Sequence, residues 1–223
     1  MPSRSESKKN PKILLVGSLS ESSKLDLFIN HEKCIKHQYS KNHQLGHQPA
    51  MGIQLNTLRF QHKNRIISLD IWNMIIQFQR YDQLASIYFD NVQAIVGVCQ
   101  MSNPATFQRM KYWLNKFREQ NSSLNNNVYM LACENDPTIR FISMESSSTE
   151  HSSTSSHVSR TQIIDYGHQI QAKIYIIRQY SRGRDLNKFF NDFLNHFWSS
   201  NLDQRLFHRI TIPSLLTNFI CCK

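Results

Sequence analysis

Four residues in one polar stretch carry side chains that could bind a metal ion: Cys34, His37, His43 and His47. Thiolate and imidazole are the protein ligands that zinc prefers. Their spacing, C-x2-H-x5-H-x3-H, matches none of the standard structural zinc sites. We therefore interpret the histidines as solvated loop residues and predict no metal site, with zinc binding as the alternative.

Two further thiols, Cys221 and Cys222, are adjacent near the C-terminal end of the sequence. Two neighbouring cysteines in a flexible tail could each accept a lipid chain, and two chains anchor a protein stably where one is marginal. The alternative is a chance pair. The other cysteines, Cys34, Cys99 and Cys133, are scattered. They do not indicate a disulfide framework, and they favour a reducing, cytosolic setting.

The chain has 223 residues and a formal net charge of +10. A basic balance favours anionic partners such as nucleic acid or an acidic membrane surface. The positive residues are spread thinly, however, with no basic helix and no ladder of basic and aromatic residues, so we predict no nucleic-acid binding. No run approaches the roughly 20 apolar residues that a membrane-spanning helix needs. Residues 1–10 are too charged for a secretory signal.

Short apolar runs alternate with amphipathic segments along the chain. Apolar runs bounded by turn residues are typical of buried parallel strands, whereas apolar residues at three- and four-residue steps indicate helices. We predict strands at 12–17, 94–98, 128–133 and 173–177, and a hairpin of strands 55–60 and 65–72 around His62-Lys63-Asn64. We predict helices at 24–29, 77–90, 105–118, 159–169 and 186–207.

This order predicts an α/β fold: a six-stranded, mostly parallel sheet with one antiparallel edge strand and helices on both faces. Residues 1–10 would be a flexible tail, 11–207 one domain, and 208–223 a second flexible tail. The serine-rich segment 141–157 cannot bury a core, so we predict a disordered insertion, with phosphorylation as an alternative role. The aromatic residues of the last helix are expected to pack in the core. They are Phe189, Phe190, Phe193, Phe197 and Trp198.

Ligands of such sheets bind beyond the carboxyl ends of the strands. Gly17, Asn73, Cys133 and Gln179 follow or end predicted strands, so one pocket could collect all four loops.

Over about residues 11–200 the chain resembles the small GTPases of the Ras superfamily, and the Rab branch most closely. The segments that resemble the family are Lys12–Gly17, Ile66–Trp72, Phe107–Trp113, and Tyr175-Ile176 followed by Gly183. In Rab proteins these correspond to the first strand, the strand before the second switch, a helix with a Phe…Trp pattern, and the strand before the last nucleotide loop. Cys221-Cys222 resembles Rab prenylation sites.

The resemblance implies a phosphate-binding loop of the form G-x-x-x-x-G-K-[ST], in which the Lys reaches the phosphates and the hydroxyl holds Mg²⁺. The sequence here departs from it: Ser22 replaces the second Gly, Ser23 stands in place of the Lys, and Lys24 stands in place of the hydroxyl residue. A shift of one residue rotates a helical side chain by about 100°. Lys24 is therefore expected to point away from a bound phosphate.

The two switch segments of the family depart as well. Ala50 stands where the first switch presents a Thr to Mg²⁺, and it has no oxygen to offer. The second switch, Asp-Thr-Ala-Gly-Gln in the family, begins here with Asn73, which lacks the carboxylate. Ile76 replaces the Gly whose N–H contacts the γ-phosphate. Gln77 stands at the water-positioning place, and we interpret it as a vestige.

Guanine recognition in the family uses Asn-Lys-x-Asp, and this chain has Cys133-Glu134-Asn135-Asp136. Only Asp136 remains, and Glu134 cannot supply the basic stem that packs on the base. Tyr180 lies in the loop that corresponds to the last nucleotide loop, where its ring could fill the base pocket.

The resemblance therefore implies a Rab-like domain that has kept the fold and lost nucleotide chemistry, a pseudo-GTPase without catalytic residues or cofactor. We expect a docking module for protein effectors in vesicle traffic, lipid-anchored to the cytosolic face of an endomembrane. One alternative is a divergent GTPase that binds GTP with Mg²⁺ through Lys24 and Asp136 and hydrolyses it slowly. The other is a structural subunit of a larger ciliary or organellar assembly.

Overall fold

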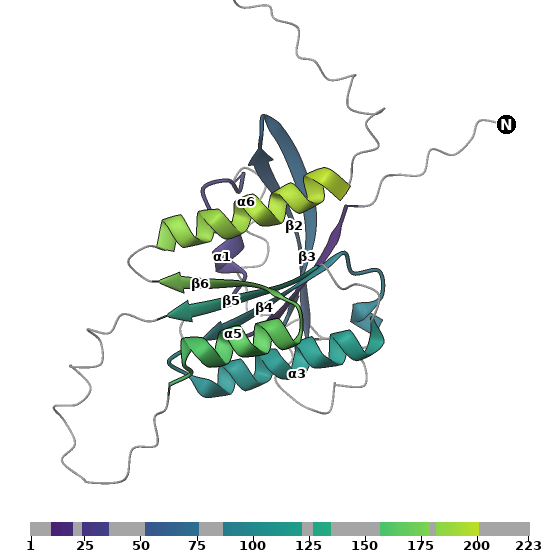
Figure 1. Cartoon of the computed structure of the whole chain (residues 1–223). Coiled ribbons are helices and arrows are strands. Elements are labelled where there is room, and N and C mark those ends of the chain that lie inside the picture. The colour runs from purple at the N-terminus through teal and green to yellow at the C-terminus, as the bar shows by residue number, and fades with distance from the viewer. Residues whose placement is uncertain are drawn as a thin grey trace, which may run out of the picture.

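The computed structural model of the chain describes residues 10–19, 24–35, 52–75, 87–121, 127–134, 157–178 and 182–200 (Figure 1). Its strands form one sheet in the order β2-β3-β1-β4-β5-β6. The strands are β1 (Lys12–Gly17), β2 (Ile53–His62), β3 (Arg65–Met74), β4 (Ala94–Gln100), β5 (Val128–Glu134) and β6 (Lys173–Arg178). The helices are α1 (Asp26–Ile29), α3 (Pro104–Gln120), α5 (Arg160–Gln169) and α6 (Arg182–Ser200).

The three most apolar strands form the centre of the sheet. β1 pairs in parallel with β3 on one side and with β4 on the other, and β4 continues in parallel to β5. Residues 13–16 of β1 have no exposed surface, and every residue of β4 is buried. A strand covered on both faces needs apolar side chains on both, which explains why these runs do not alternate. The predicted central position of the three runs is confirmed.

The antiparallel edge is the β2–β3 hairpin. Lys63 and Asn64 turn the chain with φ of +46° and +61°, the left-handed geometry of a two-residue hairpin loop. Both strands run two residues further than predicted at their far ends. The pairing continues to Ile53 opposite Met74, because both side chains are buried in the core and the ladder supports them.

Helices cover both faces of the sheet, as predicted (Figure 1). On one face, α3 and α5 contribute residues such as Met110, Trp113 and Ile163 to a buried cluster. On the other face, α1 and α6 pack Phe28, Phe190 and their neighbours into a second cluster. The sheet therefore separates two apolar cores.

Side chains at the helix ends account for the observed starts. Asn103 caps α3 by accepting a hydrogen bond from the N–H of Ala105, and Pro104 occupies the first turn, where no donor is needed. Ser159 and Gln162 form a reciprocal capping box at α5. Helix α6 begins at Arg182, four residues before the predicted start at 186, and its first turn places Asp185 against β6.

The aromatic side chains of α6 lie in the core, as predicted for most of them. Phe189, Phe190 and Phe193 have no exposed surface, and Phe197 is nearly fully buried. Trp198 is only half-buried, and its ring lies against the hairpin tip, with the Arg65 guanidinium 4.8 Å from the ring centroid. The helix thus joins the core to the end of the hairpin.

Several predicted segments lie outside the described residues: the N-terminal tail, most of helix 77–90, nearly all of the insertion 141–157, the end of helix 186–207, and the tail 208–223. Residues 87–89, which end the predicted helix 77–90, are helical. Among the described helices, none is both long and apolar enough to cross a bilayer.

Candidate functional site

The carboxyl ends of the parallel strands meet at one edge of the sheet, where ligands of open α/β sheets bind. The structure places Gly17, Asn73 and Cys133 at this edge, because β1 runs parallel to β3 and β4, and β5 runs parallel to β4. Lys24 joins them from the turn before α1, through a hydrogen bond to the end of β3. The remaining predicted site residues lie outside the described part of the chain: Ser22, Ser23, Ala50, Ile76, Gln77, Asp136, Gln179, Tyr180, Cys221 and Cys222.

Gly17 ends β1 in a conformation that only glycine adopts readily. Its φ is +88°, and a Cβ placed on it would lie 2.0 Å from the carbonyl oxygen of Val98. The next N–H, that of Ser18, donates to the same oxygen at 3.1 Å. The backbone of β4 therefore passes too close for any side chain, so the packing of β1 on β4 is enough to require glycine here.

Lys24 is a buried cation. Its side chain is 7% exposed, and Nζ donates to the backbone carbonyl oxygen of Met74 at 2.6 Å. Burial, and to a smaller extent the nearby Arg109 guanidinium, together lower the pKa of the Lys24 ammonium to about 8. The side chain thus ties the segment before α1 to the end of β3.

Asn73 lies beside this contact with its polar end buried. The residue is 2% exposed, and Nδ2 donates to Oε1 of Gln54 at 3.3 Å. Its Oδ1 has no hydrogen-bond partner among the described atoms. A buried amide oxygen without a donor is uncommon and costs about 1–3 kcal/mol.

The residues at this edge do not fit Mg²⁺. P-loop proteins hold the ion through the hydroxyl of the loop Ser or Thr and through an Asp. In the correspondence that the resemblance implies, Lys24 and Asn73 take these two positions, so an ammonium would replace the hydroxyl and a neutral amide the carboxylate. An ammonium group cannot coordinate a cation, and its charge repels one.

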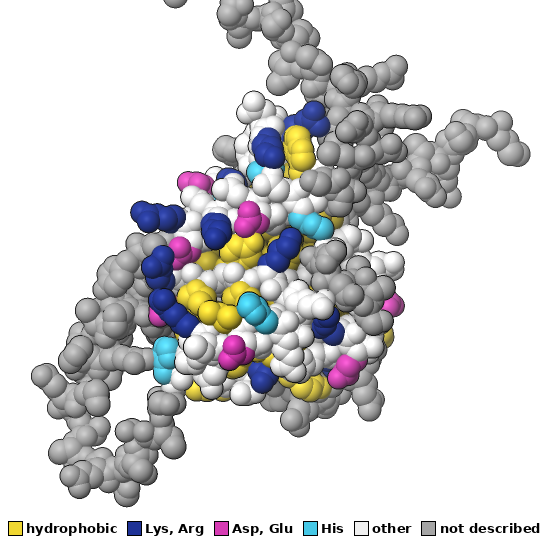
Figure 2. Space-filling view, in the orientation of Figure 1, with side chains coloured by type: hydrophobic (Ala, Val, Ile, Leu, Met, Phe, Trp, Pro, Cys, Tyr) yellow, Lys and Arg dark blue, Asp and Glu magenta, His cyan; other side chains and the backbone are white. Residues whose placement is uncertain are grey.

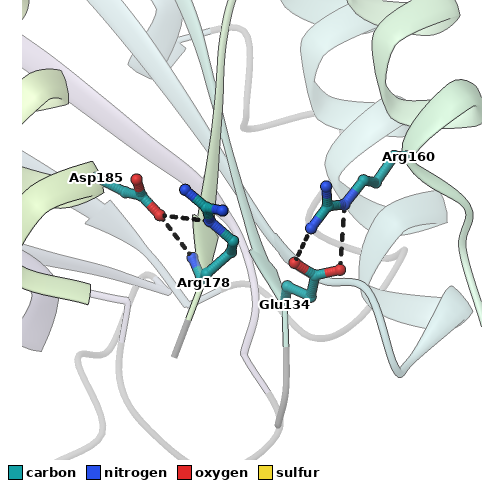
Figure 3. A network of polar contacts seen from close by, with 4 residues as sticks. All are labelled: Glu134, Arg160, Arg178 and Asp185. Atoms are coloured by element: carbon teal, nitrogen blue, oxygen red, sulfur yellow. Dashed lines mark hydrogen bonds and ion pairs between the residues drawn. The ribbon is translucent and has the colours of Figure 1, made fainter. Parts of the chain in front are cut away.

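Glu134, at the end of β5, is held by an arginine rather than presented to a ligand. Arg160 of α5 donates through Nε and a terminal nitrogen to the two carboxylate oxygens, at 3.2 Å and 2.6 Å (Figure 3). Beside it, Arg178 at the end of β6 donates through its backbone N–H and Nε to Asp185 of α6 (Figure 3). Two neighbouring ion pairs therefore occupy the edge where β5 and β6 end.

Cys133 is partly buried in the same region, and its carbonyl oxygen accepts a hydrogen bond from the N–H of Met101 at 2.9 Å. Cys99, on the neighbouring strand, is fully buried, and burial raises the pKa of its thiol above the usual range. A buried, protonated thiol is a poor nucleophile, so Cys99 is a core residue.

Sequence reasoning missed Arg160 and a row of asparagines on α6. Arg160 lies 26 residues after Glu134, so no local spacing pairs the two. Asn187, Asn191 and Asn195 recur at four-residue steps, and their Oδ1 atoms meet His31, Lys33 and His62, respectively. The four-residue period was a visible signal that one face of α6 carries amides.

Charged side chains of both signs are mixed on the side of the molecule seen in Figure 2, where both α5 and α6 are visible. Figure 2 shows Lys and Arg lying among acidic, histidine and apolar side chains on this face. The net charge of +10 is therefore not expressed here as a surface of one sign.

Comparison with known proteins finds similarity to the Ras family and to Rab proteins. The model of the Ras family matches residues 31–171. The chain is 27% identical over 122 residues to Ras-related protein RABA2a of Arabidopsis thaliana, covering 54% of this chain and 50% of that protein. It is 26% identical over 125 residues to Ras-related protein Rab-34 of Mus musculus (56% and 45%), and 27% over 73 residues to GTP-binding protein YPT53 of Saccharomyces cerevisiae (33% and 33%).

The chain thus spans about half or less of the length of these relatives. The family model, in contrast, covers more than half of the chain, and the sheet has the predicted small-GTPase architecture. On these grounds the protein belongs to the Ras family.

Proposed function

We propose that this chain is a Rab-like protein that has kept the Ras-family fold without a GTP cycle, and that it acts as a docking module in intracellular traffic. The observation that carries the proposal is the burial of the Lys24 ammonium against the carbonyl oxygen of Met74. If Lys24 corresponds to the hydroxyl residue with which family members hold Mg²⁺, as the resemblance implies, this contact fixes a positive charge beside that position. Without the metal, the charge of a bound triphosphate would lose its main counterion.

Two further observations support the same proposal. Glu134, which the resemblance aligns with the lysine that contacts the base in the family, has its carboxylate paired with Arg160. Gly17, the one loop residue that matches the phosphate-binding motif, is required by the approach of Val98. Its retention therefore does not by itself indicate phosphate binding.

The proposal predicts that guanine nucleotides do not stabilise the protein. A ligand present at a thousandfold excess over its Kd stabilises a native state by about 4 kcal/mol, which raises the melting temperature by several degrees. We expect no shift for the purified chain with millimolar GTP or GDP and Mg²⁺, measured by scanning fluorimetry or calorimetry. Nucleotide extracted from freshly purified protein and separated by chromatography should likewise be absent.

A matched variant tests the reason for the loss. Ser23→Lys together with Lys24→Thr restores the two loop residues, yet we expect no gain in melting temperature with GTP, because Asn73, Ile76 and Glu134 remain. A shift of several degrees in the wild-type chain would overturn the proposal. It would favour the alternative of a divergent GTPase, for which Ras-family membership is the supporting observation.

We further propose that Cys221 and Cys222 carry lipid chains that hold the protein at an endomembrane, where it meets its effectors. Expressed in cells of its source, the wild-type chain should sediment with membranes, and the variant Cys221→Ser/Cys222→Ser should move to the supernatant. Two chains anchor stably and one only marginally, so each single variant should be partly released.

Surface charge offers another route to membranes, and a high-salt wash separates the two routes. Electrostatic attachment is screened by salt, whereas lipid insertion is not. If the double variant sediments like the wild type and resists salt, a protein partner holds it. That result would reject lipidation and favour the structural-subunit alternative.

A further inference from the structure

Lys24 and Asn73 stand at the two positions that hold Mg²⁺ in P-loop proteins, and the structure brings them to the same place. The Lys24 ammonium lies 2.6 Å from the carbonyl oxygen of Met74, the residue next to Asn73. The side chain is 7% exposed, so bulk water does not compete effectively for this contact. In P-loop proteins a metal ion links the two corresponding positions. Here the ammonium group of Lys24 links the turn before α1 to the end of β3.

The contact lies where two long segments leave the sheet. The N–H of Ile75 donates to the carbonyl oxygen of Gly52 at 2.7 Å, directly after the carbonyl that Lys24 holds. Gly52 follows the segment 36–51, and Ile75 precedes the segment 76–86. Lys24 therefore anchors the point at which the first segment ends and the second begins, and these segments correspond to the two switches of the resemblance.

The positive charge of Lys24 disfavours the binding of a metal ion at this place. A divalent cation at the same place would be repelled by the ammonium, and Asn73, the neighbour of Met74, carries a neutral amide rather than a carboxylate to offset the charge of the ion. The Lys24 side chain bears a cost for its burial, since its pKa is lowered to about 8.

We propose that Lys24 is an internal substitute for the metal ion, holding the ends of both switch-like segments in one arrangement whether or not nucleotide or divalent cation is present. The inference deepens the proposed function, because it explains how the surface of a docking module could stay constant without a GTP cycle. It concerns the contact between Lys24 and Met74 and does not depend on whether the chain binds a nucleotide.

Amide hydrogen exchange of the full chain tests the proposal at the contact itself. In Lys24→Met the ammonium is lost while a long side chain still fills the space. We expect the N–H of Ile75 to exchange at least about tenfold faster than in the wild type, relative to the amides of the central strand β4. Unchanged relative exchange at Ile75 would overturn the proposal.

Lys12 offers a matched control on the same sheet. It also donates through Nζ to a backbone carbonyl, that of Asp90 at 2.8 Å, and burial likewise lowers its pKa. Lys12→Met should leave the relative exchange of Ile75 unchanged. Equal acceleration in both variants would show a general effect of removing a lysine and would reject the specific role of Lys24.

A second measurement uses the wild-type chain, so it holds even if Lys24→Met does not fold. Mn²⁺ broadens the NMR signals of nuclei near its binding site. We expect no selective broadening at Lys24, Asn73 or Met74 when Mn²⁺ is added without nucleotide, and selective broadening there would overturn the proposal. GTP binding without any metal would instead reject the proposed function and leave the lysine contact intact.

Discussion

Gly17→Ala is expected to destabilise the domain by about 2–5 kcal/mol. Two costs combine: a left-handed backbone costs a residue with a Cβ about 1–2 kcal/mol, and forcing atoms into a packed site costs about 1–3 kcal/mol. The steric cost applies because the new Cβ would lie 2.0 Å from a backbone oxygen of β4, and a backbone atom cannot rotate away as a side chain could. Urea unfolding followed by circular dichroism measures the change.

Gly183→Ala is the matched control for this prediction. Gly183 lies in the first turn of α6, is exposed, and has no atom within 4 Å of an added Cβ. Alanine should leave stability unchanged or raise it by about 0.5–1 kcal/mol, because it orders a helix better than glycine. If Gly17→Ala proved as mild as the control, β1 would not approach β4 as closely as described, and the glycine would need another explanation.

Truncating the aromatic core under α6 should destabilise the domain by a similar amount. Phe193→Ala is expected to lower the free energy of unfolding by about 3–5 kcal/mol, the range for removing a buried phenyl ring. The ring of Phe193 has no exposed surface, and its centroid lies 5.1 Å from that of Phe189 and 5.2 Å from that of Tyr129. The rigid neighbours can collapse little, so a cavity remains.

Chemical denaturation monitored by fluorescence and circular dichroism together would measure this loss. Lys188→Ala, at an exposed position of the same helix, should change stability by less than about 0.5 kcal/mol. A loss below about 1 kcal/mol for Phe193→Ala would mean that α6 is not docked on the sheet, contrary to the described packing.

The strands and their order could be predicted because their signal is local. An uninterrupted apolar run such as Ile13–Val16 fits only a strand covered on both faces, and amphipathic segments between such runs imply crossover helices. The hairpin was predictable from the polar turn, although not its full length. The pairing continues to Ile53 and Met74 because both side chains are buried in the core, and the residues next to them in the sequence do not indicate this burial.

The losses at the candidate site were also visible in the sequence, since a missing carboxylate or hydroxyl is a matter of residue type. Asn73 and Glu134 could be recognised as departures before any coordinates. The contacts that the residues of the candidate site make could not be predicted from the sequence, because their partners are distant along the chain. Arg160 meets Glu134 across an insertion, and Lys24 meets the carbonyl oxygen of Met74 across 50 residues.

The sequence by itself thus determined which residues can form strands and helices, and which chemical groups of the family's motifs this chain lacks. These properties follow from hydrophobic periodicity and side-chain chemistry, both of which act locally. Only the tertiary structure decided that Lys24 is buried at the end of β3, and that Gly17 is required by its approach to Val98. Both depend on how closely separate strands and turns pack, and this distance is fixed by the whole core rather than by any one segment.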